Sequence, residues 1–262
     1  MRLIIIILLL SKLLVIAGFR SFGTGISLIG TSYDYVSHNE IGKIPRIGES
    51  TNIVNLKTCS RYEIYYNNNI HNYDKNNYSY KMDDKTALKH LCEVSCGLKS
   101  PIQGENEILQ QINKKIGLMD EFNFAHHIGL YVQKNIFKYK YSIVNNILKY
   151  INTPDKVLIY GDTTIGKKLK EIIPNSICVN DLKKNINFVP DVIILTKKIN
   201  SEQDLSINNN QLLIDITTPH NDITCDKIIR LSDLKSYIPI TEHKSALNYI
   251  NDEIEKKLIH IH

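Results

Sequence analysis

The pattern of apolar and polar positions differs between the first and second parts of the chain. Short apolar, β-branched runs in the first part predict strands in GISLIGTSY from Gly25, at Ile53 to Leu56 and at Tyr62 to Tyr66. From Thr86 to about Asn146 the apolar residues recur at helical spacing instead. That second stretch predicts a helical half-domain.

The pattern changes again after Thr153 and Pro154. Four apolar runs, KVLIYG, SICVND, DVIILT and QLLIDIT, alternate with polar segments of helix length. This alternation is typical of a parallel sheet with βαβ crossovers, so the second domain is predicted to be α/β. The tail has a helical stripe, at Leu247, Ile250, Ile254 and Leu258, and such an apolar face is expected to dock on its own domain or on a partner.

Two polar segments of the first part carry weaker patterns. SHNEIGKI predicts a helix start, with Ser37 or Asn39 as its cap. The segment from Asn67 to Asp84 is rich in Asn, Tyr and Lys and is interpreted as a surface loop or ragged hairpin without chemistry.

The first residues form an apolar run from Leu3 to Phe19, preceded by Arg2 and interrupted by Lys12. Its length is near the short limit of the roughly 17 to 25 residues that span a membrane, and no clear cleavage site follows. Three interpretations stay open: an anchor or targeting segment, an element added to the core, or an extension that belongs to no domain.

Composition narrows the function classes only slightly. The 262 residues are 43% apolar, which is enough for two compact domains and argues against disorder. The formal net charge of +5 allows a nucleic-acid partner without demanding one. The five cysteines form no disulfide framework and indicate a reducing compartment; they are Cys59, Cys92, Cys96, Cys178 and Cys225.

The first candidate for chemistry is Cys59, between two predicted strands. A thiol acts as a nucleophile only as thiolate, so it needs a nearby cation that lowers its pKa. In an extended backbone Arg61 projects to the same side as Cys59. The alternative is a core thiol beside an exposed arginine.

The second candidate is the segment from His90 to Gln111. It predicts a helix that ends at Gly97, a tight turn, and a new helix whose first turn carries Glu105 and Glu107. Polar side chains and free backbone donors therefore converge at one helix junction. Cys92 and Cys96 share a helix face, but no second ligand pair matches them, so they are interpreted as packed thiols rather than metal ligands.

The third candidate is the strand, glycine turn and basic helix start in KVLIYGDTTIGKKLKEII, which predicts a phosphate-binding element. Gly161 and Gly166 match the first and third glycines of G-x-G-x-x-G, but Thr163 replaces the second. The P-loop pattern is met up to Lys167, but Lys168 replaces its hydroxyl residue. A turn without any ligand is the remaining alternative.

Taken together, these segments resemble the glutamyl-tRNA reductase family. The family's TCNR-x-E-I-Y motif is similar to TCSRYEIY, from Thr58 to Tyr65. Its long H-L-x-x-V-x-x-G-L-x-S-x-x-x-G-E-x-x-I-L-x-Q pattern is similar to HLCEVSCGLKSPIQGENEILQQ, from His90 to Gln111. LLIDITTPHND, with Asp215 and Pro219, is similar to the family's strand-turn-aspartate-proline element.

The resemblance implies an α+β N-terminal catalytic domain, an α/β Rossmann-like nucleotide-binding domain and a C-terminal helix. Its domain boundaries are expected as follows: residues 1–23 an apolar leader, 24–150 the catalytic and substrate-binding domain, 151–238 the NADPH-binding domain, and 239–262 the start of a linking helix. The family's helical dimerisation domain is expected to be absent, which makes the chain a short, divergent member.

The resemblance also implies an activity, the NADPH-dependent reduction of glutamyl-tRNA to glutamate 1-semialdehyde, the first step of five-carbon tetrapyrrole and haem biosynthesis. Cys59 would form the thioester and His90 would assist as the second catalytic residue. Arg61 would bind the substrate carboxylate and Glu105 the α-ammonium. The remaining substrate-contact positions are Thr58, Ser60, Ser100, Asn106, Glu107 and Gln111, and the cofactor positions are Gly161, Asp162, Thr163, Thr164, Ile165 and Gly166; no metal is implied.

Departures from the family pattern leave alternatives open. Thr163 weakens the expectation of NADPH binding, and Asp181 would repel the 2′-phosphate unless Lys183 or Lys184 offsets it. The alternatives are a paralogue that binds or hydrolyses glutamyl-tRNA without reduction and a P-loop-like nucleotide-binding protein. Glutamyl-tRNA is the expected partner, not DNA; a downstream aminomutase is a further candidate, and the chain is expected to be a monomer or a homodimer through the C-terminal helix. The expected location is cytoplasmic, with membrane association through residues 3–19 as the alternative.

Overall fold

The computed structural model describes ten stretches of the chain: residues 26–32, 48–58, 60–67, 79–139, 141–152, 155–181, 189–199, 205, 207–218 and 220–259. Several sequence predictions lie outside them. These are the leader from Leu3 to Phe19, the helix start with its cap at Ser37 or Asn39, and the nucleophile Cys59.

An antiparallel sheet of four strands begins the described fold, with the order β2-β3-β1-β4. Its strands are β1 (Ile26–Ser32), β2 (Ile53–Lys57), β3 (Arg61–Asn67) and β4 (Tyr80–Asp83). The first three confirm predicted strands. The fourth was not predicted: the end of the segment interpreted as a loop or ragged hairpin pairs with β1 at the sheet edge.

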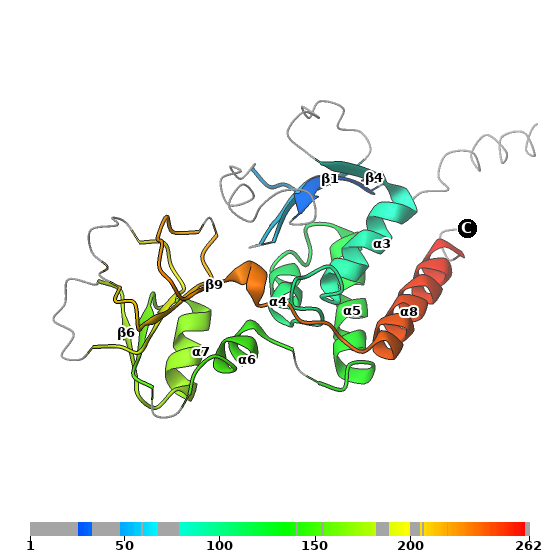
Figure 1. Ribbon diagram of the computed structural model, residues 1–262. Helices are drawn as coiled ribbons and strands as arrows, with labels where there is room; N and C mark the ends of the chain where they lie inside the picture. Colours follow the sequence, from blue (N-terminus) through cyan, green and yellow to red (C-terminus); the bar gives the residue numbers. More distant parts are fainter. Residues whose placement is uncertain are drawn as a thin grey trace, which may run out of the picture.

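Four helices follow this sheet and confirm the predicted helical half-domain (Figure 1). They are α3 (Asp84–Ser95), α4 (Glu107–Asn113), α5 (Asp120–Asn135) and α6 (Ile143–Leu148). Helix α3 packs against β1 and β4, and its buried side chains share one apolar core with the sheet and with α5. In that core the rings of Tyr65 and Phe122 meet edge to face, with centroids 5.2 Å apart.

A glycine allows the helices of this core to approach closely. A β-carbon at Gly129 of α5 would lie 2.4 Å from Ser95 Oγ and 2.6 Å from Leu109 Cδ1. Ser95 uses the proximity, because its hydroxyl donates to the carbonyl of Ala125 at 2.7 Å. Helix α5 thereby contacts both α3 and α4.

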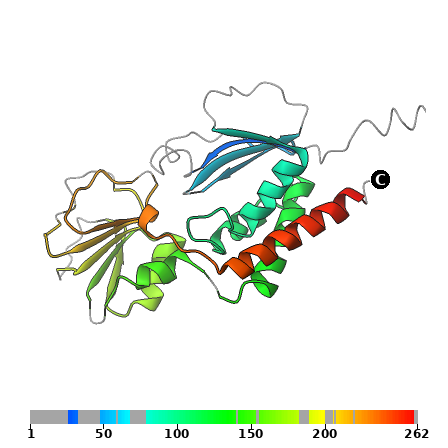
Figure 2. The same cartoon turned by 45° about the vertical axis from the view of Figure 1, so that its right-hand side comes forward.

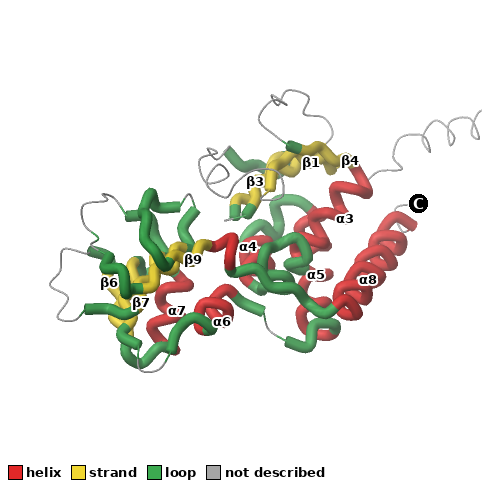
Figure 3. The backbone as a smooth tube through the Cα atoms, viewed as in Figure 1, coloured by secondary structure: helices red, strands yellow, loops and turns green. Residues whose placement is uncertain are grey.

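The second sheet is parallel and has the order β6-β5-β7-β8-β9. Its strands are drawn in yellow around the labels β6, β7 and β9 in Figure 3. Its strands are β5 (Val157–Tyr160), β6 (Ser176–Val179), β7 (Val192–Leu195), β8 (Leu212–Asp215) and β9 (Ile228–Arg230). Helix α7 (Thr164–Ile172) connects β5 to β6. The four predicted parallel strands are confirmed, and β9 is an additional one. Strand β5 lies between β6 and β7, so the chain changes direction across β5, which in such sheets creates a crevice at the carboxyl ends of the strands.

The predicted tail helix is α8 (Ile240–Ile259), and it docks on the first part of the chain. It lies along α3 and α5 (Figure 2), where Ala246, Ile250 and Ile254 are buried in the same core as those helices. Tyr249 stacks on Tyr131 of α5, with ring centroids 4.1 Å apart. The apolar stripe is therefore covered at these positions by the protein's own helices.

Hydrogen bonds connect the two sheet regions just before α8. The chain leaves β9 through a short 3-10 helix, η3 (Leu231–Asp233), and then runs beside the turn that precedes α4. Ser236 exchanges backbone hydrogen bonds with Gln103 and Pro101 at 2.9 and 3.0 Å. Asn146 Nδ2 of α6 donates to the carbonyl of Leu234 at 2.9 Å.

No helix within the described stretches has both the length and the apolar character required to cross a membrane. The apolar leader from Leu3 to Phe19 lies outside those stretches.

Candidate functional site

The connection between β2 and β3 is organised by Thr58. Its N–H donates to the carbonyl of Arg61 at 2.9 Å. Its side-chain Oγ1 accepts from the N–H groups of Ser60 and Arg61 at 3.1 and 3.2 Å. Hydrogen bonds of Thr58 thus connect it to Ser60 and Arg61, on the other side of Cys59 in the sequence. Cys59 itself lies outside the described residues.

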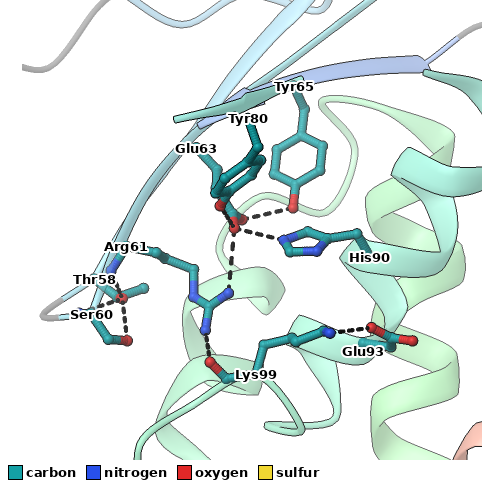
Figure 4. A network of polar contacts seen from close by, with 9 residues as sticks. All are labelled: Thr58, Ser60, Arg61, Glu63, Tyr65, Tyr80, His90, Glu93 and Lys99. Carbon is teal, nitrogen blue, oxygen red and sulfur yellow. Dashed lines mark hydrogen bonds and ion pairs between the residues drawn. The ribbon is translucent and has the colours of Figure 1, made fainter. Parts of the chain in front are cut away.

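A buried carboxylate, Glu63, is the centre of a polar network on the helix-facing side of the first sheet (Figure 4). Arg61, Glu63 and Tyr65 share that side because they are two residues apart along β3. Glu63 Oε1 receives hydrogen bonds from His90 Nε2 at 2.7 Å, Tyr80 Oη at 2.7 Å and Arg61 Nη1 at 3.3 Å. Glu63 Oε2 receives one from Tyr65 Oη at 2.8 Å.

The two charged side chains at the centre of the network are closed to solvent. Glu63 is 0% exposed and Arg61 1% exposed. Gly30, directly opposite on β1, makes room for the carboxylate, since a β-carbon there would lie 2.9 Å from Glu63 Cγ. A side chain at position 30 would displace Glu63.

The charges around Glu63 keep it ionised. Burial alone would raise its pKa, but the charges of His90 and Arg61 and the hydrogen bonds from His90 and Tyr80 outweigh burial and hold the pKa at about 2. Because an ionised carboxylate only accepts hydrogen bonds, His90 Nε2 must carry a hydrogen. The network thereby fixes which ring atom of His90 faces Glu63.

Arg61 joins the two sequence motifs. Helix α3 ends as predicted, with Cys96 as its C-cap and Gly97 at φ +76°. Arg61 Nη2 donates to the backbone carbonyl of Lys99, two residues after that glycine. The TCSRYEIY and His90 to Gln111 segments therefore lie in direct contact.

Glu105 is placed differently from the prediction. Helix α4 begins at Glu107, so only Glu107 lies in its first turn, and Glu105 instead forms an isolated bridge with Tyr141. The reason is the turn itself, since Gly97 and Gly104 both adopt positive φ and keep the backbone non-helical up to Asn106. The expectation of two first-turn carboxylates was wrong in this respect.

The Glu105 carboxyl is shifted toward its neutral form. Burial and the nearby charge of Glu107 raise its pKa to about 7, while the Ser100 hydroxyl and Arg61 offset only part of that shift. These side chains come from the turn, from α4 and from β3. The ionisation of Glu105 therefore depends on three neighbouring side chains: Ser100, Glu107 and Arg61.

This shift predicts a pH-dependent stability. A carboxyl whose pKa rises on folding stabilises the fold only while it is protonated, so the contribution is full below about pH 4.5 and is lost as the pH rises through 7. Glu105→Gln should therefore gain stability relative to wild type between pH 5 and pH 8, by about 2 to 3 kcal/mol at the upper end. Urea unfolding at both pH values measures the effect; Glu171→Gln, exposed on α7, should show no such gain. If the difference in unfolding free energy between Glu105→Gln and wild type were the same at both pH values, the raised pKa of Glu105 would be contradicted.

Three buried polar atoms of this region have no hydrogen-bond partner of good geometry among the described residues. They are Arg61 Nε, Ser100 Oγ and Glu107 Oε2. Buried groups of this kind normally find a partner, so the region has donors and an acceptor available for a bound molecule. Two further predicted contact residues lie apart from these atoms: Asn106 is exposed, and Gln111 is half-buried farther along α4.

Cys92 and Cys96 are packed thiols, as predicted. Both are 0% exposed within the first core. Burial raises the pKa of each thiol, which makes both poor nucleophiles. Within the described stretches, no group of three or more His, Cys, Asp or Glu side chains has the arrangement needed to hold a metal ion.

The glycine turn after β5 has the backbone that the sequence pattern requires. Gly161 adopts φ +104°, and a β-carbon there would lie 2.7 Å from Thr196 Oγ1. A β-carbon at Gly166 would lie 2.2 Å from the carbonyl oxygen of Gly161. The first glycine thus permits the tight turn, and the last allows α7 to pack close to the sheet.

Thr163 takes a structural position within this turn. It is the N-cap of α7, where its side chain accepts from Gly166 N–H at 3.1 Å and donates to Thr196 Oγ1 at 2.9 Å. Its hydroxyl is therefore directed to the end of β7. Of the other predicted cofactor positions, Asp162 and Thr164 are exposed and Ile165 is half-buried.

Lys168 and Asp215 belong to the two other patterns predicted for this domain, the P-loop pattern and the strand-turn-aspartate-proline element. Lys168, which replaces the P-loop hydroxyl residue, places its ammonium 3.7 Å from Glu107 of α4. The predicted Asp215 ends β8 fully buried and accepts from the N–H groups of Thr217 and Asn221 at 3.0 and 2.9 Å. Pro219, Lys183 and Lys184 lie outside the described residues.

Comparison with known proteins identifies the first part of the chain. Residues 36–139 match the family described as "Glutamyl-tRNAGlu reductase, N-terminal domain". By this match, residues 36–139 are similar to the N-terminal domain of glutamyl-tRNA reductases.

Individual relatives are similar to the chain at low sequence identity. The glutamyl-tRNA reductase of Clostridium kluyveri is 31% identical over 179 residues, covering 55% of this chain and 45% of the relative. That of Clostridium botulinum (strain Alaska E43) is 28% identical over 262 residues, covering 78% and 64%. The matches to these glutamyl-tRNA reductases thus span about half to two thirds of the relatives' own length. The solved glutamyl-tRNA reductase of Methanopyrus kandleri aligns over 90% of this chain and 78% of that chain, at 16% identity and a TM-score of 0.38.

Three members of the Glu63 network were not predicted as site residues: Glu63, Tyr65 and Tyr80. Glu63 stands inside the quoted TCSRYEIY motif, and a carboxylate at the centre of a predicted buried strand was the signal available for it. Tyr80 belongs to β4, which was not predicted, so no local pattern identified it.

Proposed function

We propose that this chain performs the chemistry of a glutamyl-tRNA reductase, converting glutamyl-tRNA to glutamate 1-semialdehyde in tetrapyrrole biosynthesis. The observation that supports this most directly is the contact between the two motif segments. Arg61, one residue after Ser60, is bonded to Lys99 and, through Glu63, to His90. This contact supports an acyl-transfer site in which Cys59, two residues before Arg61 in the sequence, is the nucleophile.

In the proposed first step the Cys59 thiolate attacks the ester carbonyl carbon of glutamyl-tRNA. A carbon–sulfur bond forms, the bond to the terminal ribose oxygen breaks, and that oxygen takes up a proton. The result is a thioester, whose carbonyl carbon is more electrophilic than that of a carboxylate. Arg61, close to Cys59 in the sequence, favours the thiolate form.

Arg61 and Glu105 orient the glutamyl group. Each Arg61 Nη atom makes one hydrogen bond within the chain and Nε makes none, so Nε and the second hydrogen of each Nη are the donors for the substrate carboxylate. Glu105 binds the α-ammonium, and an ammonium beside it stabilises the ionised carboxylate against the burial that raises its pKa to about 7. Ser100 Oγ and Glu107 Oε2 complete the polar lining.

His90 acts as the proton donor or polariser near the reacting carbonyl. Its Nε2 is committed to Glu63, so Nδ1 is the ring atom that exchanges a proton with the substrate. Glu63 is then a positioning residue, because it orients His90 and Arg61 without contact to the substrate.

The reduction requires NADPH, which supplies a hydride to the thioester carbon when bound. Two of the three glycines of the dinucleotide-binding pattern are present, and both fit such a cofactor. A side chain at Gly161 or Gly166 would obstruct the turn between them. The turn from Gly161 to Gly166 would hold the pyrophosphate. Cleavage of the carbon–sulfur bond then returns Cys59 as thiolate and releases the aldehyde.

A second candidate is hydrolysis of glutamyl-tRNA without reduction. Thr163 stands where a dinucleotide approaches the backbone most closely, and Asp181 follows β6, where a 2′-phosphate would be repelled. In this case water cleaves the thioester and releases glutamate.

The proposed activity assigns roles to the parts of the fold. Residues 24–150 form the catalytic domain, 151–238 the NADPH domain, and 239–262 a linking helix. The substrate places the reaction in the cytoplasm, and the unstable product favours transfer to a downstream aminomutase.

One assay separates these candidates. Purified protein is incubated with glutamyl-tRNA, with and without NADPH, and glutamate 1-semialdehyde and free glutamate are both quantified. We expect semialdehyde only with NADPH. Glutamate without any semialdehyde would favour the hydrolase, and the absence of both products would overturn both candidates.

A further inference from the structure

Gln133 of α5 lies beside the turn that runs from Cys96 to Glu105, and no sequence pattern assigned it a role. Its amide nitrogen Nε2 donates to three backbone carbonyls: that of Gly104 at 3.0 Å, and those of Cys96 and Glu105 at 3.3 Å. Cys96 is the C-cap of α3 and begins the turn, whereas Gly104 and Glu105 form its end. One side chain therefore connects the two ends of the turn.

The face of α5 that carries Gln133 is the face that approaches α3 and α4. Gly129 stands one helical turn before Gln133, and the absence of a side chain there lets α5 come close to Ser95. Phe137 stands four residues after Gln133, and a β-carbon at Gly104 would lie 3.3 Å from its ring. The packing of this face thus places the Gln133 amide beside the turn.

The turn supplies three groups to the proposed acyl site. The carbonyl of Lys99 accepts from Arg61 Nη2, the Ser100 hydroxyl is buried, and Glu105 ends the turn. The segment consists of turns and isolated bridges rather than a regular helix or strand, so its position depends on individual hydrogen bonds. The bonds from Gln133 are three of these.

We propose that Gln133 is a positioning residue which sets how well the site distinguishes a substrate with an α-ammonium from one with a neutral group. The proposal rests on the proposed function, in which Glu105 binds the α-ammonium of the glutamyl group. The Gln133 amide is directed at the backbone of the turn, so it acts on the substrate only through Glu105. Without it the Glu105 carboxylate is free to shift, and a displacement of about 1 Å is enough to weaken a positioned contact strongly. Arg61 keeps its bond to Glu63 in that case.

The test compares two substrates that differ only at the α-position. Glutamyl-tRNA is compared with 2-hydroxyglutaryl-tRNA, in which a hydroxyl replaces the ammonium. The release of uncharged tRNA is followed with NADPH present and is corrected for the rate without protein. We expect wild type to prefer glutamyl-tRNA about tenfold to hundredfold in kcat/KM, as for a hydrogen bond to a charged group. Gln133→Met, which has a similar length and no donor, should lose most of this preference and retain turnover of 2-hydroxyglutaryl-tRNA.

Further variants show how Gln133 acts. Gln133→Lys supplies an ammonium with three hydrogens for the three carbonyls and should keep the preference, so it also tests the proposal if Gln133→Met does not fold. The double variant Glu105→Gln/Gln133→Met should show the same preference as Glu105→Gln alone, because both changes act on one contact. The matched control is Asn135→Met on the same helix, whose exposed amide donates to the carbonyl of Tyr131 at 3.0 Å; it should behave as wild type.

Three results would overturn the proposal. Gln133→Met could slow both substrates by the same factor, as a purely structural role requires, or Gln133→Lys could lose the preference. Equal turnover of both substrates by wild type would also overturn it, since no α-ammonium would then be recognised. If wild type released no uncharged tRNA from either substrate, the proposed function itself would fail, and this result is distinct from the other three.

Discussion

Glu63→Gln is expected to lower the free energy of unfolding by about 3 kcal/mol at neutral pH, a large effect for a change of one atom. Arg61 is 1% exposed and depends on the Glu63 carboxylate for its only described ion pair. An amide removes that charge and leaves the guanidinium buried beside a neutral group, which typically costs 3 to 5 kcal/mol. The amide NH₂ would also face the hydrogens of His90, Tyr80 or Tyr65.

The pH dependence of stability provides a sharper measurement. The folded pKa of Glu63, about 2, lies below its ordinary value of 4.5, so its stabilisation is full above about pH 4.5 and is lost as the pH falls toward 2. Guanidinium unfolding at pH 7 and pH 3 should show this loss in wild type and not in Glu63→Gln. Glu93→Gln is the matched control and should cost under about 1 kcal/mol, because Glu93 is also buried but, among the described residues, forms an ion pair only with the exposed Lys99.

Two outcomes would contradict the account of the network. Equal unfolding free energies for Glu63→Gln and wild type at pH 7 would show that the carboxylate is not needed to compensate Arg61. If Glu63→Gln lowered the free energy of unfolding no more than Glu93→Gln does, the additional hydrogen bonds of Glu63 would contribute nothing to stability. In activity assays the variant should both lower kcat and raise KM, because Glu63 orients His90 as well as Arg61, which binds the substrate carboxylate in the proposed mechanism.

Strong periodicity explains why most of the fold could be predicted. Strands β5, β7 and β8 are continuous apolar runs because both faces of a parallel sheet are covered: Ile194 is buried in the core on one face and Ile193 in the core on the other. The apolar stripe of α8 could be predicted because its apolar residues recur at helical spacing. The elements missed are those without such a signal: β4 is a polar edge strand of four residues, and β9 has only three.

The site could be predicted only where its residues are close in sequence. His90 and Ser100 to Gln111 belong to one continuous pattern, and Thr58 to Arg61 to another. That Glu63 binds both Tyr80 and His90 follows from the pairing of β1 with β3 and β4, which joins segments many residues apart. The position of Glu105 outside α4 was missed because it depends on the φ values of Gly97 and Gly104, which spacing alone does not reveal.

The proposed nucleophile provides the second large prediction: Cys59→Ser should lower turnover of glutamyl-tRNA by a thousandfold or more. A serine hydroxyl stays protonated near neutral pH, and no general base activates it in the proposed mechanism, in which the thiolate itself attacks. The matched control is Cys225→Ser, a free and half-exposed cysteine in the second sheet region, which should keep wild-type activity.

A covalent readout makes this prediction independent of NADPH. Wild type incubated with glutamyl-tRNA alone should gain one glutamyl group, detected by mass spectrometry of the intact chain after a rapid acid quench, and peptide mapping should place it on residue 59. Cys59→Ser should gain none, whereas Cys225→Ser should be labelled like wild type. Cys92 and Cys96 should stay unlabelled in every variant, because burial raises the pKa of both thiols and keeps them protonated. Labelling of either core cysteine, or full turnover by Cys59→Ser, would mean that the acyl group is transferred elsewhere, and the role of Arg61 and His90 around this turn would have to be assigned anew.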